Sequence, residues 1–513
     1  PPQKWDAMYD GIQRANDVLR TLKAANANDM SASDTILARA QAVFLRAFYH
    51  FELVRVFKHI PFVDESVTFA ANDYNVPNVD GSGNFINPMP KIEADFQYAM
   101  QYLPATWNGD KGRANKYAAE AFLAKCYMYD QNYSGAIPLL GDLMVNGETA
   151  SGDRYALQKN YFNNFNADPT AKNTSESVFA AQMSVNDGSA AATNQQGNPN
   201  GNYGDALNFP YNGGPGACCG FDNPSQDLAD AYKTDPATGL PLLDGSFETG
   251  GHVIARGTWA GTLDPRIDFV MGRPGIPYLD WGPHPGDAWI RDTLNDGHFN
   301  PKKNVYALSQ KTTLADNSST YWAAVELTAD NVNLIRYSDV MLWMAECQVQ
   351  TSGDLGTAEA LVDSVRSRAA NPAYWTYINN DGTAPTFNAT SYSYTQKPGT
   401  TIPADNYKIG LYPTGTFAAN GAAYALKAIQ FERRLEFAME GQRFFDLQRW
   451  DFGSPGSMAA VLNNYVKVTA PLRPAFIGAT FVQGKSELFP IPQNQIDIEN
   501  EQGKINLKQN PGY

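Results

Sequence analysis

Small and large apolar residues alternate at helical spacing in two stretches of the chain. Between residues 115 and 145 the pattern predicts two helices joined by a polar turn at 131–134, with Ser134 as the expected N-cap of the second helix. Between residues 331 and 369 the arrangement recurs, with a turn that differs by one residue. The second helices share one apolar spacing, formed by Ala136, Leu140 and Leu143 and by Ala358, Val362 and Val365. Small residues that face large ones let paired helices approach closely.

Two cysteines occupy one position of this repeat. Cys126 and Cys347 each lie inside the first helix of a pair, so we expect both to be buried packing residues rather than disulfide partners. Three further segments show helical periodicity, namely 5–22, 31–57 and 424–450. Ser31 and Asp34 form a capping box at the start of the second, and Gly441 is the expected break in the third.

Helical pairs of about 34 residues are typical of tetratricopeptide-like repeats, which stack because one pair cannot bury its apolar face alone. Here the pairs lie near both ends of the chain, separated by residues 147–330, which are rich in Gly, Asn, Pro, Asp and aromatic residues. We therefore predict a mainly α fold, in which four helix-turn-helix units form an α–α superhelix. A large irregular, loop-rich region should pack against it, and its aromatic content favours an ordered structure.

The charge balance narrows the class of ligand. The chain has 513 residues, a formal net charge of −14 and a pI of about 4.9, and its longest run of Lys and Arg is two residues. Nucleic acids and anionic lipids both require a basic face, so neither fits this chain. A neutral ligand fits best.

Cysteine usage and the chain start give further constraints. Cys218 and Cys219 are adjacent in a Gly-rich stretch and are either free thiols or a strained vicinal disulfide. A metal site is not expected there, because no second Cys or His pair lies nearby. No stretch approaches the roughly 20 apolar residues of a membrane helix. Pro1 stands directly before a predicted helix, which indicates a processed or trimmed N-terminus.

Several segments have sequences that can be compared with those of known protein families. They are NPSQDLADAY at 223–232, NLIRYSDVML at 333–342 with AEC at 345–347, ERRLE at 432–436 with EGQR at 440–443 and DLQRW at 446–450, and FPIP at 489–492 with Ile496 and LKQNPGY at 507–513. Taken together and in this order, they span nearly the whole chain and resemble the SusD/RagB-like family of outer-membrane nutrient-binding lipoproteins.

This resemblance implies a tetratricopeptide-like scaffold that carries a loop-rich glycan-binding part. It implies an N-terminal SusD-like helical domain, 1–180, and a C-terminal SusD/RagB domain, 181–513, packed as one unit. Within the latter, the ligand region is 181–330 and the helical repeats are 331–513. Family members are lipid-anchored on the outer-membrane surface of Bacteroidetes-type bacteria and pair with a SusC-like TonB-dependent transporter. Their lipidated Cys precedes the helix matched by 5–22, so we expect the anchor to lie before this sequence.

Four of the nine Trp residues lie between 259 and 322, in the densest aromatic stretch of the loop-rich region. Flat rings suit the apolar C–H faces of sugars, while carboxylates and amides suit their hydroxyls. Taken with the resemblance, this predicts one shallow, exposed glycan-binding surface formed by Trp281, Trp289, Tyr278, Trp322 and Asp287, with Tyr74 on the opposite wall. For each ring alone the alternative is a core position, because most large aromatic side chains are buried.

The acidic and histidine patterns do not predict catalysis. Glu432, Glu436 and Glu440 lie four residues apart on one helical face. Each has an arginine close in sequence, namely Arg433, Arg434 and Arg443. Such neighbours favour structural ion pairs over the raised pKa that a glycosidase acid needs. The histidines form no metal-binding pair, and residues 80–84 resemble a calcium loop without its closing Glu, so we predict no cofactor, with structural calcium as the alternative.

These observations predict a non-enzymatic protein that captures a neutral oligo- or polysaccharide at the cell surface and delivers it to a partner TonB-dependent transporter. Three alternatives remain. A peptide-import lipoprotein on the same scaffold would have a deeper groove with polar groups that read a peptide backbone. A protein-interaction scaffold would leave the loop tryptophans unexplained. A glycan-cleaving enzyme would need a paired, desolvated set of carboxylates.

Overall fold

The structure, a computed structural model, describes residues 2–26, 28–68, 75–188, 200–202, 208–217, 219–303, 305–317, 327–351, 353–500 and 505–513. It contains two compact units. Unit 1 comprises Pro1–Gly152, Phe445–Leu462 and Thr480–Tyr513, and unit 2 comprises Asp153–Phe444 and Asn463–Ala479. The chain leaves unit 2 within α14 (Arg443–Gly453) and returns to it within α15 (Ser457–Thr469).

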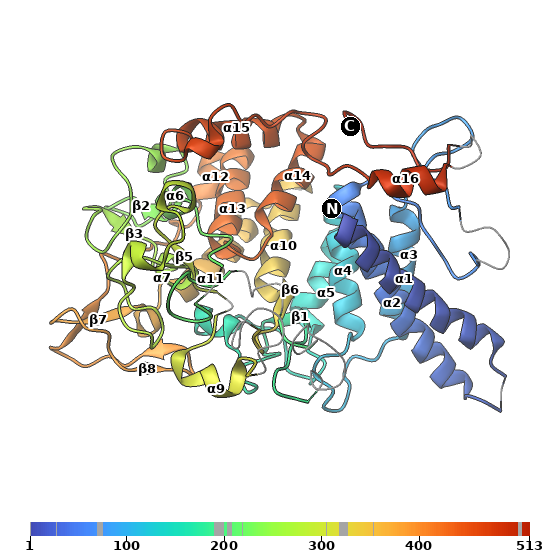
Figure 1. The fold of residues 1–513 in the computed structure, drawn as a ribbon, viewed down its shortest axis with the longest axis horizontal. Coiled ribbons are helices and arrows are strands. Elements are labelled where there is room, and N and C mark those ends of the chain that lie inside the picture. Colours follow the sequence, from blue (N-terminus) through green and yellow to red (C-terminus); the bar gives the residue numbers. More distant parts are fainter. Residues whose placement is uncertain are drawn as a thin grey trace. The chain divides into compact units, whose positions relative to one another are not determined.

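Unit 1 is built from helices that pack in sequence order. They are α1 (Pro2–Ala24), α2 (Ala32–Phe57), α3 (Met89–Tyr102), α4 (Lys116–Tyr129) and α5 (Tyr133–Asn146), followed near the C-terminus by α16 (Gln493–Glu499). Each of the first four contacts the next, and Figure 1 shows α1 and α2 as two long helices side by side. Three rings join α2, α3 and α4, because Phe44 and Phe96 both pack on Phe122, with ring centroids 5.7 and 5.4 Å away.

Polar caps fix where these helices begin. The Ser31 hydroxyl accepts a hydrogen bond from the Asp34 amide (3.1 Å) and donates one to its carboxylate (2.7 Å). Ser31 is therefore the N-cap of α2, but the Asp34 side chain bonds to the Ser31 hydroxyl instead of to its backbone amide, as the predicted capping box would require. The cap of α5 is Asn132, whose side-chain oxygen accepts the Gly135 amide at 3.0 Å. The prediction of Ser134 as this cap is therefore wrong, because the helix already includes Ser134 and Asn caps as well as Ser does.

Unit 2 combines a helical part with short elements in long loops. Its helices are α6 (Gln226–Ala231), α7 (Ile267–Val270), α8 (Thr293–Asp296), α9 (Lys311–Leu314), α10 (Tyr337–Thr351), α11 (Leu355–Ala369), α12 (Thr416–Asn420) and α13 (Ala422–Glu436). The helices α10, α11 and α13 pack against one another. Since α13 ends at Glu436 and α14 begins at Arg443, the predicted break near Gly441 is confirmed. Within the described ranges, no helix has both the length and the apolar character needed to cross a membrane.

Short antiparallel strand pairs fasten the loops of unit 2. The pairs are β1 (Ser177–Ala181) with β6 (Val332–Arg336), β2 (Lys233–Thr234) with β3 (Thr262–Leu263), β4 (Met271–Gly272) with β5 (Asn300–Pro301), β7 (Tyr377–Asn379) with β10 (Thr401–Pro403), and β8 (Phe387–Asn388) with β9 (Ser393–Tyr394). Short 3-10 helices also lie in the loops of unit 2, at Tyr161–Phe165, Ser246–Glu248, Gly286–Trp289, Leu308–Gln310, Pro372–Tyr374 and Pro474–Phe476. The described parts of the loop-rich region are therefore irregular, as predicted.

The two predicted helix pairs are α4–α5 and α10–α11. Cys126 in α4 and Cys347 in α10 are both completely buried and keep their thiols, which confirms their prediction as packing residues. Burial raises the pKa of the Cys126 thiol well above its usual range. Cys219 is disulfide-bonded, and Cys218 lies outside the described residues.

The C-terminal part of the chain completes the end of α2. The last carbonyls of a helix have no partner within the helix. In α2 those of Arg55, Val56 and Phe57 accept hydrogen bonds from the Gln448 amide side chain (2.9 Å), the Phe489 amide (3.0 Å) and the Asn510 amide side chain (2.8 Å). This is why unit 1 includes residues near 450 and 510 and why the units differ from the predicted division at residue 180, which kept 181–513 together.

A buried carboxyl group in α4 should make unit 1 less stable at alkaline pH. Glu120 is 3% exposed, and burial, then the negative charge of Asp142, raises its pKa to about 8. The folded state thus holds a proton that the unfolded chain releases, so this contribution is complete below the ordinary value of 4.5 and is lost as the pH rises through 8.

In the wild type, the free energy of unfolding should therefore decrease between mildly acidic and alkaline pH. In Glu120→Gln we expect this decrease to be smaller, by on the order of 2 kcal/mol. Urea unfolding followed by circular dichroism at several pH values measures this difference. Asp10→Asn, which breaks an exposed ion pair with Arg14, is the control and should leave the pH dependence as in the wild type. Equal pH profiles for Glu120→Gln and the wild type would contradict the expectation.

Candidate functional site

The structure corrects the prediction for Tyr278. Its side chain is completely buried, and its hydroxyl donates a hydrogen bond to the Pro301 carbonyl. The ring lies over Gly272, where an added Cβ would be only 2.6 Å from it. Tyr278 therefore belongs to an aromatic core of unit 2 and does not line an exposed surface, because the missing side chain of Gly272 leaves the space that the ring fills.

Trp281 and Trp289 are half-buried and pack on that same core. The Trp281 indole donates to the Tyr306 carbonyl at 3.1 Å, and the Lys311 ammonium lies 5.8 Å from its ring centroid. Trp289 contacts Tyr278 edge to face, with ring centroids 5.5 Å apart. Both indoles thus have structural partners, and each keeps only part of its surface accessible.

The other predicted site residues do not join the two indoles. Asp287 is exposed and accepts a hydrogen bond from His298 at 2.8 Å. Trp322 and Tyr74 lie outside the described residues.

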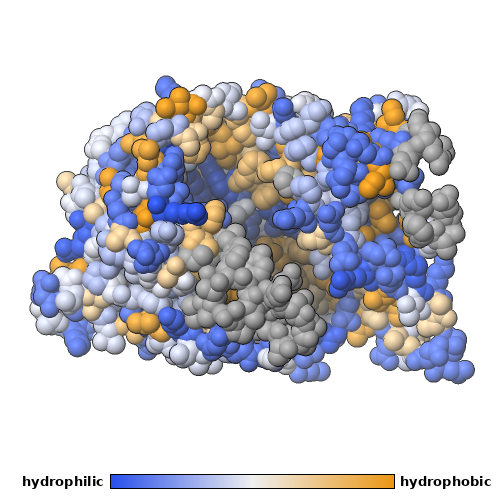
Figure 2. Space-filling view, in the orientation of Figure 1, coloured by the Kyte–Doolittle hydropathy of each residue, from blue (hydrophilic) through white to orange (hydrophobic). Residues whose placement is uncertain are grey.

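Two exposed rings that the sequence did not single out lie on one loop. The face in Figure 2 is mainly hydrophilic, with hydrophobic residues in small separate groups. In the described part of the chain, the exposed aromatic side chains are Tyr102, Tyr211, Phe221, Phe489 and Tyr513. Tyr211 and Phe221, 40% and 48% exposed, belong to residues 208–223, which we name the aromatic loop. The Arg291 guanidinium lies 5.9 Å from one ring centroid and 5.8 Å from the other.

The aromatic loop is held in a tightly turned conformation. Left-handed backbone angles occur at Gly214, Gly216 and Gly220 and also at Asn212, Ala217, Cys219 and Asp222. Non-glycine residues in this region are costly, and such strain is typical of functional loops. The Gly216 amide donates to the Tyr306 hydroxyl (2.9 Å), and the Tyr211 amide donates to the Trp289 carbonyl (3.0 Å). These bonds tie the loop to the aromatic core.

The Trp289 indole packs against the backbone of the aromatic loop. An added Cβ would lie 2.1 Å from the indole at Gly213 and 2.8 Å from it at Gly214, so the ring covers both glycines. On the other side the ring packs on His284, with centroids 5.2 Å apart. Trp289 was predicted on an exposed glycan-binding surface. Instead its indole fills the space between the aromatic loop and the aromatic core, like a wedge, and in this way positions Tyr211 and Phe221.

The same loop lines a cavity of about 530 Å³, which we name the amide pocket. Its lining is Phe165, Asn208, Asp222, Asn223, Val332, Asn333, Met439, Glu440 and Gly441. Amide and carboxylate groups beside a buried phenyl ring can bond to hydroxyls while an apolar ring face packs on the phenyl group. This size and composition suit a sugar unit or another neutral polar molecule.

A chain of hydrogen bonds orients one amide of the pocket. Nδ1 of His284 accepts the Gly286 amide (3.0 Å), so its Nε2 donates to the Asn300 oxygen (2.7 Å). Burial lowers the pKa of His284 to about 4, which keeps the ring neutral. The Asn300 amide then donates to the oxygen of Asn223 (3.4 Å). Nδ2 of Asn223 is buried and donates to no described residue, and Asn223 itself lines the pocket.

Of the two acidic side chains that line the pocket, Glu440 is paired with cations. Glu440 accepts hydrogen bonds from Lys303 (2.7 Å) and from Arg336 (2.8 and 2.9 Å). Burial lowers the pKa of Lys303 to about 8, against the effect of the Glu440 carboxylate. A paired Glu440 offers oxygen acceptors without demanding a cationic ligand, which agrees with a neutral one.

The predicted row of glutamates is a buried ion-pair network, but its partners differ from the prediction. The carboxylates are Asp264, Glu176, Glu432, Glu436 and Glu440, and the cations are Arg266, Arg336, Arg366, Arg368 and Lys303. Arg433 and Arg434, the neighbours in sequence, pair instead with Asp339 and Asp227, because they project from other sides of α13. The glutamates are thus engaged in structural pairs and are not arranged as a glycosidase acid and base.

In the calcium-like loop at residues 80–84, backbone amides of the loop itself bind the Asp80 carboxylate. Asp80 accepts hydrogen bonds from the amides of Ser82 (2.8 Å) and Asn84 (2.9 Å). Within the described ranges, no group of three or more His, Cys, Asp and Glu side chains is placed to hold a metal ion.

Comparison with known proteins identifies the family. Residues 175–513 match the sequence model described as SusD family, and residues 1–128 match one described as starch-binding associating with outer membrane. The first match covers well over half of the chain. This protein therefore belongs to the SusD family, as its resemblance to SusD/RagB-like sequences indicated.

Individual relatives are distant. SusD-like protein P25 of Formosa agariphila is 24% identical over 380 residues, which cover 71% of this chain and 61% of P25. SusD-like protein P2 of the same organism is 29% identical over 167 residues, which cover 33% of this chain and 31% of P2. The matched part thus spans less than two thirds of the length of these relatives.

Solved structures share the fold over the whole chain. A laminarin binding SusD-like protein has a TM-score of 0.63 at 24% identity, covering 100% of this chain and 86% of its own. Surface glycan-binding protein A from Bacteroides fluxus has a TM-score of 0.60 at 20% identity, covering 99% and 85%. These likenesses confirm the predicted fold class, a mainly α, tetratricopeptide-like scaffold with a large irregular region.

Proposed function

We propose that this protein binds a neutral oligo- or polysaccharide at the cell surface, without cleaving it, and delivers it to a SusC-like TonB-dependent transporter in the outer membrane. The observation that carries the binding proposal is the aromatic loop, which presents two exposed rings and also lines the amide pocket. Membership of the SusD family supports it, as do the ligands named for similar structures, laminarin and surface glycans. Attachment through an N-terminal lipid is part of this proposal.

Each part of the site has a task in binding. Tyr211 and Phe221 stack on the apolar faces of sugar rings, while Arg291 holds both rings and donates hydrogen bonds to sugar hydroxyls. Asn223 donates from the amide pocket to a further hydroxyl. Contacts of this kind are few and largely solvent-exposed, so the affinity should be weak, which suits a protein that must release its ligand to a partner. The exposed parts of Trp281 and Trp289 extend the proposed surface.

Removing the exposed rings should weaken glycan binding without unfolding the protein. We expect Tyr211→Ala and Phe221→Ala to lower the affinity about fivefold each and the double variant about 25-fold, since each stacked ring contributes on the order of 1 kcal/mol. Affinity-gel electrophoresis against a panel of neutral polysaccharides that includes laminarin measures the change.

A matched control lies in unit 1. Tyr102 in α3 is 39% exposed, similar to Tyr211, and its replacement by Ala should leave the affinity unchanged. If the double variant retains wild-type affinity for a glycan that the wild type binds, the aromatic loop is not the binding surface. If the wild type binds none of the neutral glycans, the proposed function itself is wrong.

A further inference from the structure

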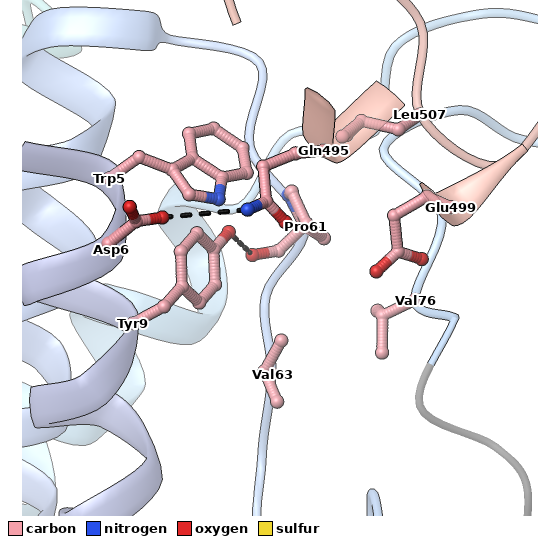
Figure 3. A pocket seen from close by; sticks show the side chains of 9 residues that line it. All are labelled: Trp5, Asp6, Tyr9, Pro61, Val63, Val76, Gln495, Glu499 and Leu507. Carbon is pink, nitrogen blue, oxygen red and sulfur yellow. Dashed lines mark hydrogen bonds between the residues drawn. The ribbon is translucent and has the colours of Figure 1, made fainter. Parts of the chain in front are cut away.

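Unit 1 contains a separate cavity of about 360 Å³ near the C-terminus, which we name the acidic cavity (Figure 3). Its lining comes from α1, from α16 and from the segments between α2 and α3 and after α16, as Trp5, Asp6, Tyr9, Pro61, Val63, Val76, Gln495, Glu499 and Leu507. Figure 3 shows the α1 residues on one side, the α16 residues on the other, and the Glu499 carboxylate directed toward Val76. A volume of this size accommodates a small organic molecule.

The walls of the acidic cavity are mainly apolar and aromatic. Trp5 and Tyr9 pack together with ring centroids 4.8 Å apart, and the Tyr9 hydroxyl donates to the Pro61 carbonyl at 2.8 Å. That hydroxyl is thereby occupied within the protein. Pro61, Val63, Val76 and Leu507 supply aliphatic surface. Such walls favour a compact body with an apolar face, and the electron-rich ring faces also attract cations.

The charged groups of the acidic cavity are both negative. One carboxylate oxygen of Glu499 is buried and accepts no hydrogen bond from any described residue. Burial raises the pKa of Glu499 to about 6, so the group is ionised at neutral pH yet poorly solvated. Asp6 is exposed and, among the described residues, accepts a long side-chain hydrogen bond from Gln495, at 3.5 Å. No Lys, Arg or His lies among the residues that line the cavity.

We propose that the acidic cavity binds a small organic cation, a protonated primary amine carried on a compact ring. The ammonium group would donate to the Glu499 carboxylate and lie near Asp6, while the ring of the ligand packs against Trp5, Val63 and Val76. A neutral ligand would leave the Glu499 carboxylate uncompensated, and burying such a group without a partner is unfavourable. This site is independent of the proposed glycan surface, since its lining lies entirely in unit 1.

Two amines test which kind of ring the ligand carries, an apolar ring in cyclohexylamine or a sugar ring in glucosamine. Cyclohexylamine and glucosamine are titrated into the full chain by calorimetry and saturation-transfer NMR, with cyclohexanol and glucose as their neutral counterparts. We expect at least one amine to bind and both neutral compounds to fail. Glu499→Gln should lower the affinity for the bound amine about tenfold or more, because it replaces a charged acceptor by a neutral one.

Two further variants separate charge from shape. Asp497→Asn removes the same charge from an exposed position of α16 and should leave the affinity unchanged. Val76→Phe keeps both carboxylates but fills the cavity, and it should abolish binding. The proposal is overturned if neither amine binds, if a neutral counterpart binds as well as its amine, or if Glu499→Gln binds like the wild type. Glycan affinity, measured in parallel, should not change in any of these variants.

Discussion

Glu436→Gln should lower the free energy of unfolding of unit 2 by about 4 kcal/mol, the range seen when one member of a buried ion pair is removed. Glu436 is completely buried at the end of α13 and bonds to Arg266 (3.2 Å), Arg336 (2.8 Å) and Arg368 (2.5 Å). Burial alone would raise its pKa, but the charges of Arg368, Arg336 and Arg266 outweigh burial and hold the pKa well below the ordinary value.

The size of this effect follows from the balance of charges in the network. Five carboxylates and five cations share one buried region, so each arginine depends on carboxylates that several segments contribute. The neutral side chain of the Glu436→Gln variant keeps the shape of the original and leaves an excess of positive charge in a region without water to screen it. The decrease in the free energy of unfolding therefore comes more from arginines whose charge is no longer compensated than from lost contacts.

Urea unfolding followed by tryptophan fluorescence measures the difference. Asp10→Asn serves as the comparison, because it removes one carboxylate from an exposed pair with Arg14 and should cost less than about 1 kcal/mol. A similarly small change for Glu436→Gln would mean that the network contributes little to stability. Because the low pKa is an effect of folding, stability from Glu436 should also be lost as the pH falls below the ordinary carboxyl range.

The helical scaffold was predictable from the sequence because its determinants are local. The spacing of Ala136, Leu140 and Leu143 is read within one helix, and the N-cap of Ser31 on the Asp34 amide spans four residues. The closure of α2 by Asn510 and the pairing of Glu432 with Arg366 join segments 453 and 66 residues apart. No local periodicity contains such pairings, so the ionic character of the glutamate row was predictable while its partners were not.

The candidate site was predictable only in part, for a similar reason. Aromatic density pointed to the stretch that contains Trp289, but density does not distinguish a ring that faces solvent from one that fills a space over Gly272, as Tyr278 does. Tyr211 and Phe221 are exposed because the loop turns through left-handed angles at residues such as Asn212 and Ala217. Those residue types occur in many conformations, so the sequence gives no strong indication of the turn.

Trp289→Ala should destabilise unit 2 by about 3 kcal/mol, the lower end of the cost of truncating a packed tryptophan, since the ring is half-buried. The indole fills the space between the Gly213–Gly214 backbone and the rings of Tyr278 and His284. This revises the expectation for an exposed sugar platform, where truncation would weaken binding and leave stability unchanged. Loss of the wedge should also release the aromatic loop and weaken glycan binding at least as much as the loss of Tyr211 and Phe221 together.

Two further variants test whether the packing of the Trp289 indole against the aromatic loop is what glycan binding depends on. Gly213→Ala places a Cβ 2.1 Å from the indole and must displace it, so it should weaken glycan binding while retaining every aromatic ring of the site. Trp107→Ala removes another half-buried indole, which donates to the Ala114 carbonyl (2.8 Å) in unit 1, and should reduce stability without changing the affinity. Thermal unfolding and affinity-gel electrophoresis on the same preparations separate the two effects. A Trp289→Ala protein with wild-type stability and no glycan binding would instead make Trp289 a direct sugar platform.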